Sequence, residues 1–329
     1  MGKKKILILG GTSFIGRNLV EHLLLRNDIE LTLFNRQKTD SELFPTVQKI
    51  KGDRETSDIQ QISKENWDVV IDVSCYYPES LRLVLTHLNS KPQKYIFVST
   101  CSVYDAEKNK SPLKSENTPT LPCTQEQSTD RTISTYGNRK AECERILQQS
   151  GLDITIFRPA LVYGKYDPTD RFYYWLYQIQ KKDTLLLPET GKRVFSTTYV
   201  MDLVNLITES IYNSSTGIYN ATSRVETSIG QLVDSAKLQL KKQPQSINAS
   251  SEFLKKENII QWMEMPLWIN GDHFTFSNDK VQNDFQFKPT AFDHAVGETL
   301  KYYSDQNWPE PTYGISEKVR LYLIAKLTE

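Results

Sequence analysis

Short apolar runs alternate with amphipathic stretches along the first half of the chain. The first run, Ile6–Leu9, passes through glycines into a stretch with apolar residues at helical spacing, namely Ile15, Leu19, Leu23 and Leu24. The other predicted strands are Leu31–Asn35, Val47–Lys51, Val69–Val73, Tyr95–Ser99 and Ile154–Arg158, and the clearest helices are Pro78–Asn89 and Ser134–Ser150. This alternation predicts an α/β fold of Rossmann type, with a doubly wound parallel sheet that binds ligands at the carboxyl ends of its strands.

The pattern changes after about Pro159, where aromatic-rich and irregular stretches follow. We therefore predict a dinucleotide-binding domain over residues 1–165 and a smaller substrate-binding lobe over most of 166–329. The two interleave, because Phe195–Leu206 has the pattern of another core strand and helix, so that residues 194–212 return to the first domain. The polar segment Asp105–Arg131 has no clear periodicity and is predicted to be a structureless lid or mobile loop.

Composition narrows the range of partners. The 329 residues carry 40 Lys and Arg against 40 Asp and Glu, so no bulk charge attracts nucleic acid or an anionic membrane. No apolar run has transmembrane length. The four cysteines form no C-x-x-C pair, which is typical of reduced thiols in the cytoplasm, and the four histidines show no metal-ligand spacing. We expect a cytoplasmic protein with a small-molecule substrate and no metal.

The segment GGTSFIG, Gly10–Gly16, carries the clearest candidate chemistry. A strand, a glycine turn and a helix in this order predict a dinucleotide site, because the pyrophosphate binds the free N–H groups of the helix N-terminus. Ser13 replaces the middle glycine of the spacing G-x-x-G-x-x-G, and we predict that it caps the helix or donates its hydroxyl to the pyrophosphate. The predicted cofactor residues here are Gly10, Thr12, Ser13, Phe14, Ile15 and Gly16.

A tyrosine four residues before a lysine supplies an acid and base group for hydride chemistry. The pattern Y-x-x-x-K occurs four times, at Tyr104/Lys108, Tyr136/Lys140, Tyr177/Lys181 and Tyr322/Lys326. Position favours Tyr136/Lys140, which begins the helix that follows a strand ending in the hydroxyl-rich segment Ser99–Ser102. A hydroxyl there hydrogen-bonds the oxygen that the tyrosine protonates. Lys140 is expected to lower the pKa of the phenol from about 10 towards neutrality. The alternative is an exposed helix start with an ordinary i,i+4 pair.

These pieces together resemble the short-chain dehydrogenase/reductase superfamily, in its extended form of nucleotide-sugar epimerases and dehydratases. The matching motifs are GGTSFIG, FVSTCSVY (Phe97–Tyr104), YGNRK (Tyr136–Lys140), RPALVYG (Arg158–Gly164) and FSTTYVMDL (Phe195–Leu203). LFNR (Leu33–Arg36) and DPTDRF (Asp167–Phe172) are similar to an atypical subgroup whose glycine motif is GGxxxxG. Members of that subgroup carry names such as isoflavone reductase, sugar dehydratase or mRNA-binding protein.

The resemblance implies roles for individual residues. Thr100 takes the catalytic Ser/Thr position with Ser102 as helper, Tyr136 is the acid and base, and Lys140 holds the cofactor ribose. Ser74 and Pro159 join the cofactor residues, with Arg158–Gly164 passing the nicotinamide. Arg193 and, less directly, Arg171 match positions that contact a substrate phosphate or sugar nucleotide, although surface ion pairs would explain them equally well. The helices Pro78–Asn89 and Ser134–Ser150 imply a homodimer.

The end of the second strand predicts which dinucleotide binds. NAD-binding members of the superfamily carry an acid there for the adenosine ribose, whereas this chain has Phe34, Asn35 and Arg36. An arginine attracts the 2′-phosphate of NADP, so NADP is favoured over NAD. Asp53 resembles the acid of the family that contacts adenine.

The resemblance also restricts the reaction. It implies hydride transfer at a hydroxyl or keto carbon of a sugar or nucleotide sugar, once in a reductase and twice in an epimerase. Sugar 4,6-dehydratases carry Asp-Glu after the catalytic threonine, where this chain has Cys101-Ser102, so dehydration is disfavoured. The alternative is an RNA-binding or regulatory protein that keeps the fold as a scaffold. Ser13 and the long interval between Thr100 and Tyr136 favour that alternative, and the complete Thr100–Tyr136–Lys140 set opposes it.

Overall fold

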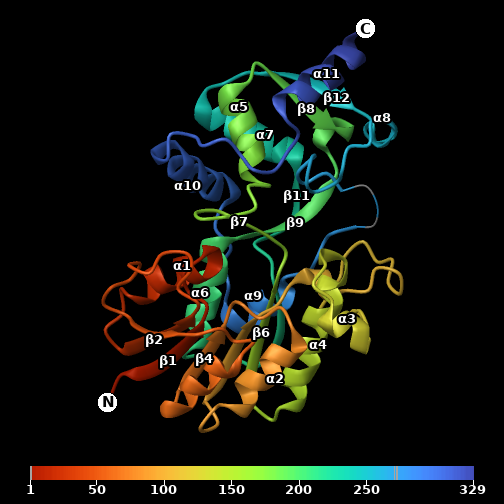
Figure 1. Ribbon diagram of the computed structural model, residues 1–329. Helices are drawn as coiled ribbons and strands as arrows, with labels where there is room; N and C mark the ends of the chain where they lie inside the picture. Colours follow the sequence, from red (N-terminus) through yellow and green to blue (C-terminus); the bar gives the residue numbers. More distant parts are fainter. Residues whose placement is uncertain (1, 270, 272) are drawn as a thin grey trace.

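A seven-stranded parallel sheet forms the base of the molecule in the computed structural model, which describes residues 2–269, 271 and 273–329. The strand order is β10-β6-β5-β4-β1-β2-β3, and every neighbouring pair is parallel (Figure 1). The strands are β1 (Lys4–Leu9), β2 (Ile29–Asn35), β3 (Gln48–Lys51), β4 (Val69–Asp72), β5 (Lys94–Val98), β6 (Ile154–Pro159) and β10 (Gly217–Ala221). The predicted doubly wound sheet is confirmed.

Each face of this sheet has its own hydrophobic core. Side chains alternate along a strand, so Ile6 and Ile8 of β1 enter one core while Leu7 and Leu9 enter the other. All four are buried, as expected for a parallel sheet covered on both faces. One face is covered by α1 (Phe14–Leu23), α6 (Val200–Ser210) and α9 (Asp279–Phe285), and the other by the 3₁₀ helix η1 (Ser57–Lys64), α2 (Pro78–Thr86) and α4 (Tyr136–Gln149).

The second lobe lies above the carboxyl ends of these strands and packs around aromatic side chains (Figure 1). Trp175, Trp268 and Tyr173 are almost completely buried in it. One of its sheets has the order β11-β9-β7 and the other pairs β12 with β8. The elements are β7 (Leu161–Tyr163), α5 (Tyr173–Lys181), β8 (Thr184–Pro188), η4 (Glu189–Gly191), β9 (Val194–Tyr199), β11 (Arg224–Ser228), α7 (Ile229–Leu240), β12 (Gln245–Ala249), α8 (Ser251–Lys256), α10 (Phe292–Asp305) and α11 (Glu317–Thr328).

The strand and helix predicted at Phe195–Leu206 both form, but they serve different sheets. β9 pairs with β7 and β11 in the second lobe, whereas α6 packs against α1 beside the seven-stranded sheet. The strand that extends the main sheet after α6 is β10, which pairs with β6. Thus β9 and α6 connect the two lobes, and β10 is the strand with which the chain rejoins the main sheet.

The segment Asp105–Arg131 is not the structureless loop that its polarity predicts. Within it, α3 (Gln125–Thr129) begins with a capping box made by Thr124 and Gln127. The backbone of Lys114 donates to the carbonyl of Thr275 at 3.1 Å and accepts from the amide of Ser277 at 2.9 Å. The prediction of a structureless segment is therefore wrong, because backbone pairing with residues far away in the sequence orders this stretch.

Candidate active site

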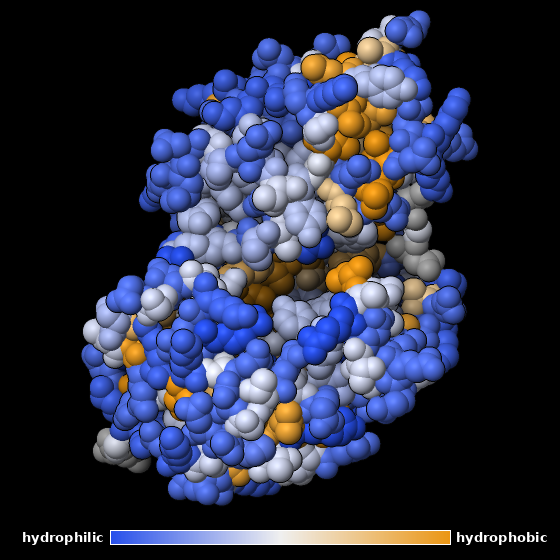
Figure 2. Space-filling model, viewed as in Figure 1, coloured by the Kyte–Doolittle hydropathy of each residue, from blue (hydrophilic) through white to orange (hydrophobic). Residues whose placement is uncertain are grey.

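The predicted cofactor residues all lie at the carboxyl ends of strands of the main sheet. These ends face the second lobe across a hollow with apolar side chains at its base (Figure 2). Asn35 ends β2 and Arg36 follows it, Asp53 follows β3, Ser74 follows β4 and Pro159 ends β6. The residues that follow β1 are Gly10, Thr12, Ser13, Phe14, Ile15 and Gly16. The parallel order of the strands therefore gathers them along one edge.

The turn between β1 and α1 has the shape that a dinucleotide needs. The amide of Gly10 donates to the carbonyl of Phe34 at 3.0 Å, which fixes the turn against β2. A Cβ atom at Gly16 would come within 2.7 Å of the backbone nitrogen of Gly11, so only glycine allows the helix to start this close to the turn. The first amides of α1 have no partner within the helix, so they are the donors that this turn offers to an anion such as a pyrophosphate.

Ser13 occupies the N-cap position of α1 but makes no capping hydrogen bond with its side chain. The predicted capping role is therefore wrong. The residue is exposed, with extended backbone, at the N-terminus of α1. Its hydroxyl is thus available for the second predicted role, donation to a pyrophosphate.

Arg36 and Asp53 lie next to each other beyond β2 and β3. The Arg36 guanidinium is 3.9 Å from the Asp53 carboxylate, and its side chain is 60% exposed. Asn35 supports this corner, because its amide donates to the Gly10 carbonyl at 3.2 Å and its side-chain oxygen accepts from the amide of Gln37. The residue predicted to attract a 2′-phosphate, Arg36, and the acid predicted to contact adenine, Asp53, therefore lie at one corner of this edge.

A buried ion pair that the sequence did not reveal lies below Ser74. Arg54 donates through both terminal nitrogens to Asp72, each at 2.7 Å, and also approaches the Ser74 hydroxyl at 3.3 Å. Tyr95 donates to the same carboxylate at 3.0 Å. Burial alone would favour the neutral acid, but Arg54 holds the pKa of Asp72 below its usual value. The pair therefore fixes the β4 end that carries Ser74.

The predicted catalytic hydroxyls are brought together. Thr100 begins the 3₁₀ turn η2 (Cys101–Val103), where its hydroxyl accepts from the Ser102 amide at 3.1 Å and donates to the Ser102 hydroxyl at 3.2 Å. The Thr100 side chain also lies near Tyr136, where it lowers the pKa of the phenol against the larger effect of burial. Gly137 makes this approach possible, because a Cβ atom there would collide with the carbonyl of Ser102.

Lys140 does not tune Tyr136 as the spacing predicts. Its ammonium donates to the carbonyls of Cys75 at 2.9 Å and Val98 at 2.7 Å. Burial raises the pKa of Tyr136 to about 12, against the opposing effects of the nearby Thr100 hydroxyl and the charge of Arg171. The predicted lowering of the phenol pKa is therefore wrong in this structure, because desolvation outweighs the cations.

A second buried clamp joins β5 to α4. Glu144 lies one turn after Lys140 and accepts from the Ser99 hydroxyl at 2.5 Å and from Arg158 at 2.5–3.2 Å. Both members of the ion pair are only 3% exposed. Since Ser99 directly precedes Thr100, this clamp sets the spacing between the threonine and the helix that carries Tyr136.

The two predicted substrate arginines have different surroundings. Arg171 lies between β7 and α5, where its guanidinium stacks over Trp262 at 5.6 Å and opposes the raised pKa of Tyr136 by its charge. Arg193 directly precedes β9, at the end of that strand away from α6, and donates to the carbonyl of Gly271. The charge of Arg171 thus acts on a predicted catalytic residue, whereas the hydrogen bond of Arg193 links this arginine to a segment of the second lobe.

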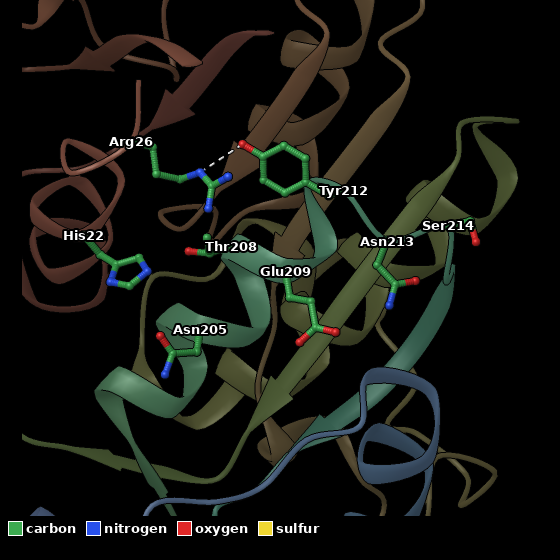
Figure 3. Close-up of a pocket in the computed structure, with 8 residues that line it drawn as sticks. All are labelled: His22, Arg26, Asn205, Thr208, Glu209, Tyr212, Asn213 and Ser214. Carbon is green, nitrogen blue, oxygen red and sulfur yellow. Dashed lines mark hydrogen bonds between the residues drawn. The ribbon is translucent and has the colours of Figure 1, made fainter. Parts of the chain in front are cut away.

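A groove of about 730 Å³ lies beside the C-terminal ends of α1 and α6 (Figure 3). Arg26 donates there to the Tyr212 hydroxyl at 3.1 Å, and burial together with Arg26 lowers the pKa of His22. The lining residues are His22, Arg26, Asn205, Thr208, Glu209, Tyr212, Asn213 and Ser214. None of them belongs to the predicted site, so the groove is separate from it.

The structure describes the side chains of residues 2–269, 271 and 273–329. No cluster of three or more His, Cys, Asp or Glu side chains suited to a metal ion is present in these residues. Nor does any helix in this part of the chain have both the length and the apolar character to cross a membrane.

Comparison with known proteins identifies the family. The model of the NAD dependent epimerase/dehydratase family matches residues 6–221, about two thirds of the chain. The chain belongs to this family. The resemblance to extended short-chain dehydrogenases/reductases is thereby confirmed, and the matched region runs from β1 to the end of β10.

This epimerase/dehydratase family member is similar to proteins with different names. A curated Arabidopsis thaliana protein, chloroplast stem-loop binding protein of 41 kDa b, is 27% identical over 326 residues, covering 92% of this chain and 79% of that protein. UDP-glucuronic acid 4-epimerase from Bacillus cereus, solved with UDP-glucuronic acid and NAD, is 18% identical with a TM-score of 0.70, covering 92% and 99%. dTDP-glucose 4,6-dehydratase from Bacillus anthracis, solved with NAD, is 19% identical with a TM-score of 0.71, covering 94% and 99%. These two solved structures share the fold of the present protein.

Proposed function

We propose that this protein is an NAD(P)-dependent epimerase or reductase that transfers hydride at a hydroxyl or keto carbon of a sugar, with a nucleotide sugar as the preferred substrate class. The observation that carries the proposal is the close packing of the turn that begins at Thr100 against the start of α4, the helix of Tyr136 and Lys140, where only a glycine fits at position 137. The epimerase and dehydratase with this fold bind NAD, and the epimerase was solved with a nucleotide sugar.

In this proposal Tyr136 transfers the proton, and Thr100 and Lys140 orient the substrate and the cofactor. A bound nicotinamide would accept hydride from the substrate carbon or return hydride to it. Tyr136 takes the proton of the substrate hydroxyl in oxidation and gives it back in reduction. Thr100 hydrogen-bonds the same substrate oxygen and orients it towards the phenol. Two of the three Lys140 N–H donors are used on carbonyls, which leaves the third for the ribose.

Epimerase and reductase chemistry are favoured over dehydration. The positions after Thr100 are Cys101, which is buried, and Ser102, which is exposed, and neither can act as a carboxylic acid. Arg171 is the substrate arginine that we favour, since its charge acts on Tyr136 and its guanidinium stacks over Trp262. Its Nε donates to the Thr169 hydroxyl at 3.2 Å, and we assign its two terminal nitrogens to phosphate. Arg193 remains a second candidate for the same contact.

Arg36→Ala is expected to weaken NADPH binding by roughly ten- to a hundredfold while NADH binding changes little, because the charge-assisted contact to the 2′-phosphate is lost. The measurement is a titration of the purified protein with each nucleotide, followed by nicotinamide fluorescence. Lys38→Ala removes another exposed cation from the same turn and is the matched control. Tighter binding of NADH than NADPH by the unaltered protein would refute the NADP preference. Binding of neither would refute the enzymatic proposal.

RNA binding is a second candidate, favoured by the name of the stem-loop binding relative. If the enzymatic proposal holds, a hairpin RNA should bind only with the micromolar or weaker affinity of non-specific contacts and should be released between 50 and 200 mM salt. Gel mobility shifts across this salt range, with and without NADPH, measure both properties. Nanomolar binding that survives 200 mM salt, in a protein that binds neither nucleotide, would replace the enzymatic proposal with the RNA-binding one.

A further inference from the structure

Two buried cysteines face each other behind the candidate active site. The Sγ atoms of Cys75 and Cys143 are 3.9 Å apart, and the residues are 1% and 0% exposed. Both thiols are free, so the contact is an S–H···S interaction. A disulfide bond is about 2.05 Å long, so the two sulfurs would have to approach by roughly 2 Å. Cys101 and Cys123 instead contact the carbonyls of Arg158 and Thr124.

The surroundings of Cys75 favour a thiolate. Burial raises the pKa of its thiol, but the hydrogen bond from Cys143 and the charge of Arg54 bring it down to about 7, with a smaller contribution from Lys140. The negative charge of Asp72 raises the pKa of this thiol. The sulfur also approaches the Tyr77 carbonyl at 3.5 Å and the Ser80 hydroxyl at 3.8 Å. The thiolate is the nucleophilic form of cysteine, so Cys75 is the sulfur that would react first.

The pair bridges the two elements that carry the site. Cys75 directly follows Ser74, and its carbonyl accepts the hydrogen bond from Lys140. Cys143 lies on α4, three residues after Lys140 and seven after Tyr136. A bond between the sulfurs would therefore pull the β4–α2 turn and α4 together at the point where Lys140 is held. Since we assign the third Lys140 N–H donor to the cofactor ribose, a displacement of this ammonium would remove a charge-assisted hydrogen bond to the cofactor.

We propose that Cys75 and Cys143 form a reversible disulfide that switches off cofactor binding at the neighbouring site. With hydrogen peroxide as oxidant, the Cys75 thiolate attacks one peroxide oxygen, the O–O bond breaks, and a sulfenic acid forms. The Cys143 sulfur then attacks the Cys75 sulfur and displaces its oxygen as water. Overall two thiols and one peroxide give one disulfide and two waters, with the thiols oxidised and the peroxide reduced. A dithiol reductant reverses the bond by exchange.

The test treats the full chain with hydrogen peroxide, quenches it with an alkylating reagent under denaturing conditions, and maps the peptides by mass spectrometry. We expect the number of alkylated cysteines to fall from four to two, with a peptide linking Cys75 to Cys143 that dithiothreitol removes. The same samples are titrated with NADPH and NADH, and oxidation should weaken binding roughly tenfold or more. Cys143→Ser should retain its nucleotide binding after peroxide, whereas Cys101→Ala, a buried control, should respond like the unaltered protein.

The outcomes separate this proposal from the proposed function on which its second half rests. Oxidation confined to Cys123, or sulfonic acid at Cys75 without a linked peptide, overturns the disulfide. A linked peptide with unchanged nucleotide affinity overturns the switch. If the reduced protein binds neither nucleotide, the proposed function and the switch both fall, and the peptide map alone still decides whether the disulfide forms.

Discussion

Replacing Glu144 with alanine is expected to lower the free energy of unfolding by about 3–5 kcal/mol, because it leaves the Arg158 guanidinium buried without a counter-charge. Arg158 is 3% exposed and donates to both carboxylate oxygens of Glu144. Its guanidinium also lies over the Tyr104 ring at 4.8 Å, a position that offers no access to bulk water. The Ser99 hydroxyl loses its acceptor in the same variant. The measurement is urea denaturation of the two proteins under identical conditions.

Two further variants separate charge from fold. Glu144→Gln keeps an acceptor for Ser99 but removes the charge. Its free energy of unfolding should therefore lie between that of the unaltered protein and that of Glu144→Ala. Glu142→Ala removes an acid from the same helix, where the partner Arg145 is 32% exposed, and should cost less than about 1 kcal/mol. Equal losses for Glu142→Ala and Glu144→Ala would show that helix α4, not the buried pair, is responsible.

The main sheet could be predicted from sequence because its strands are buried on both faces. Central strands such as β1 and β4 therefore appear as short apolar runs, and α1 and α2 have apolar stripes, whereas the edge strand β3 is largely polar. β9 shows the limit of this reasoning. Burial makes a strand recognisable, but hydrophobicity does not specify its partner, so the return to the main sheet was assigned to β9 although β10 makes it.

The positions of the site residues followed from the fold, whereas their interactions did not. Once the strand order is known, Gly10, Asp53 and Thr100 must lie on one edge. Arg54 pairs with Asp72 across 18 residues and Ser99 with Glu144 across 45, and no periodicity links such pairs. A buried acid at the end of the run Val69–Asp72 was the available signal, because a buried charge requires a partner.

The behaviour of Tyr136 illustrates the same limit in energetic terms. The Tyr–Lys spacing places both residues on the first turns of α4, which begins at Tyr136. Whether the phenol pKa falls or rises depends on desolvation, which only the packed structure contains. Here burial raises the pKa of the phenol, and the Lys140 ammonium is turned to backbone carbonyls.

Tyr136→Phe is expected to lower kcat/KM by roughly 10²–10⁴-fold while nucleotide affinity stays within about twofold, because the variant loses only the hydroxyl that moves the proton. The measurement uses the sugar with the highest turnover in a screen of keto sugars and nucleotide sugars, with NADPH absorbance as readout. Tyr76→Phe is the matched control, since its ring lies 6.0 Å from that of Tyr136 and the variant loses an equivalent phenol. Comparable losses in both variants would contradict the assignment.

The pH dependence gives Tyr136 a second, independent test. Its pKa of about 12 means that the phenol is protonated at neutral pH, so the phenolate that accepts the substrate proton increases tenfold with each pH unit. For oxidation of the alcohol, log kcat/KM of the unaltered protein should therefore rise with a slope near one between pH 6 and 9, because this parameter reports groups of the free enzyme. Reduction, which needs the phenol, should be independent of pH over the same range. In Tyr136→Phe the slope for oxidation should disappear, and a slope that persists would assign the base to another residue.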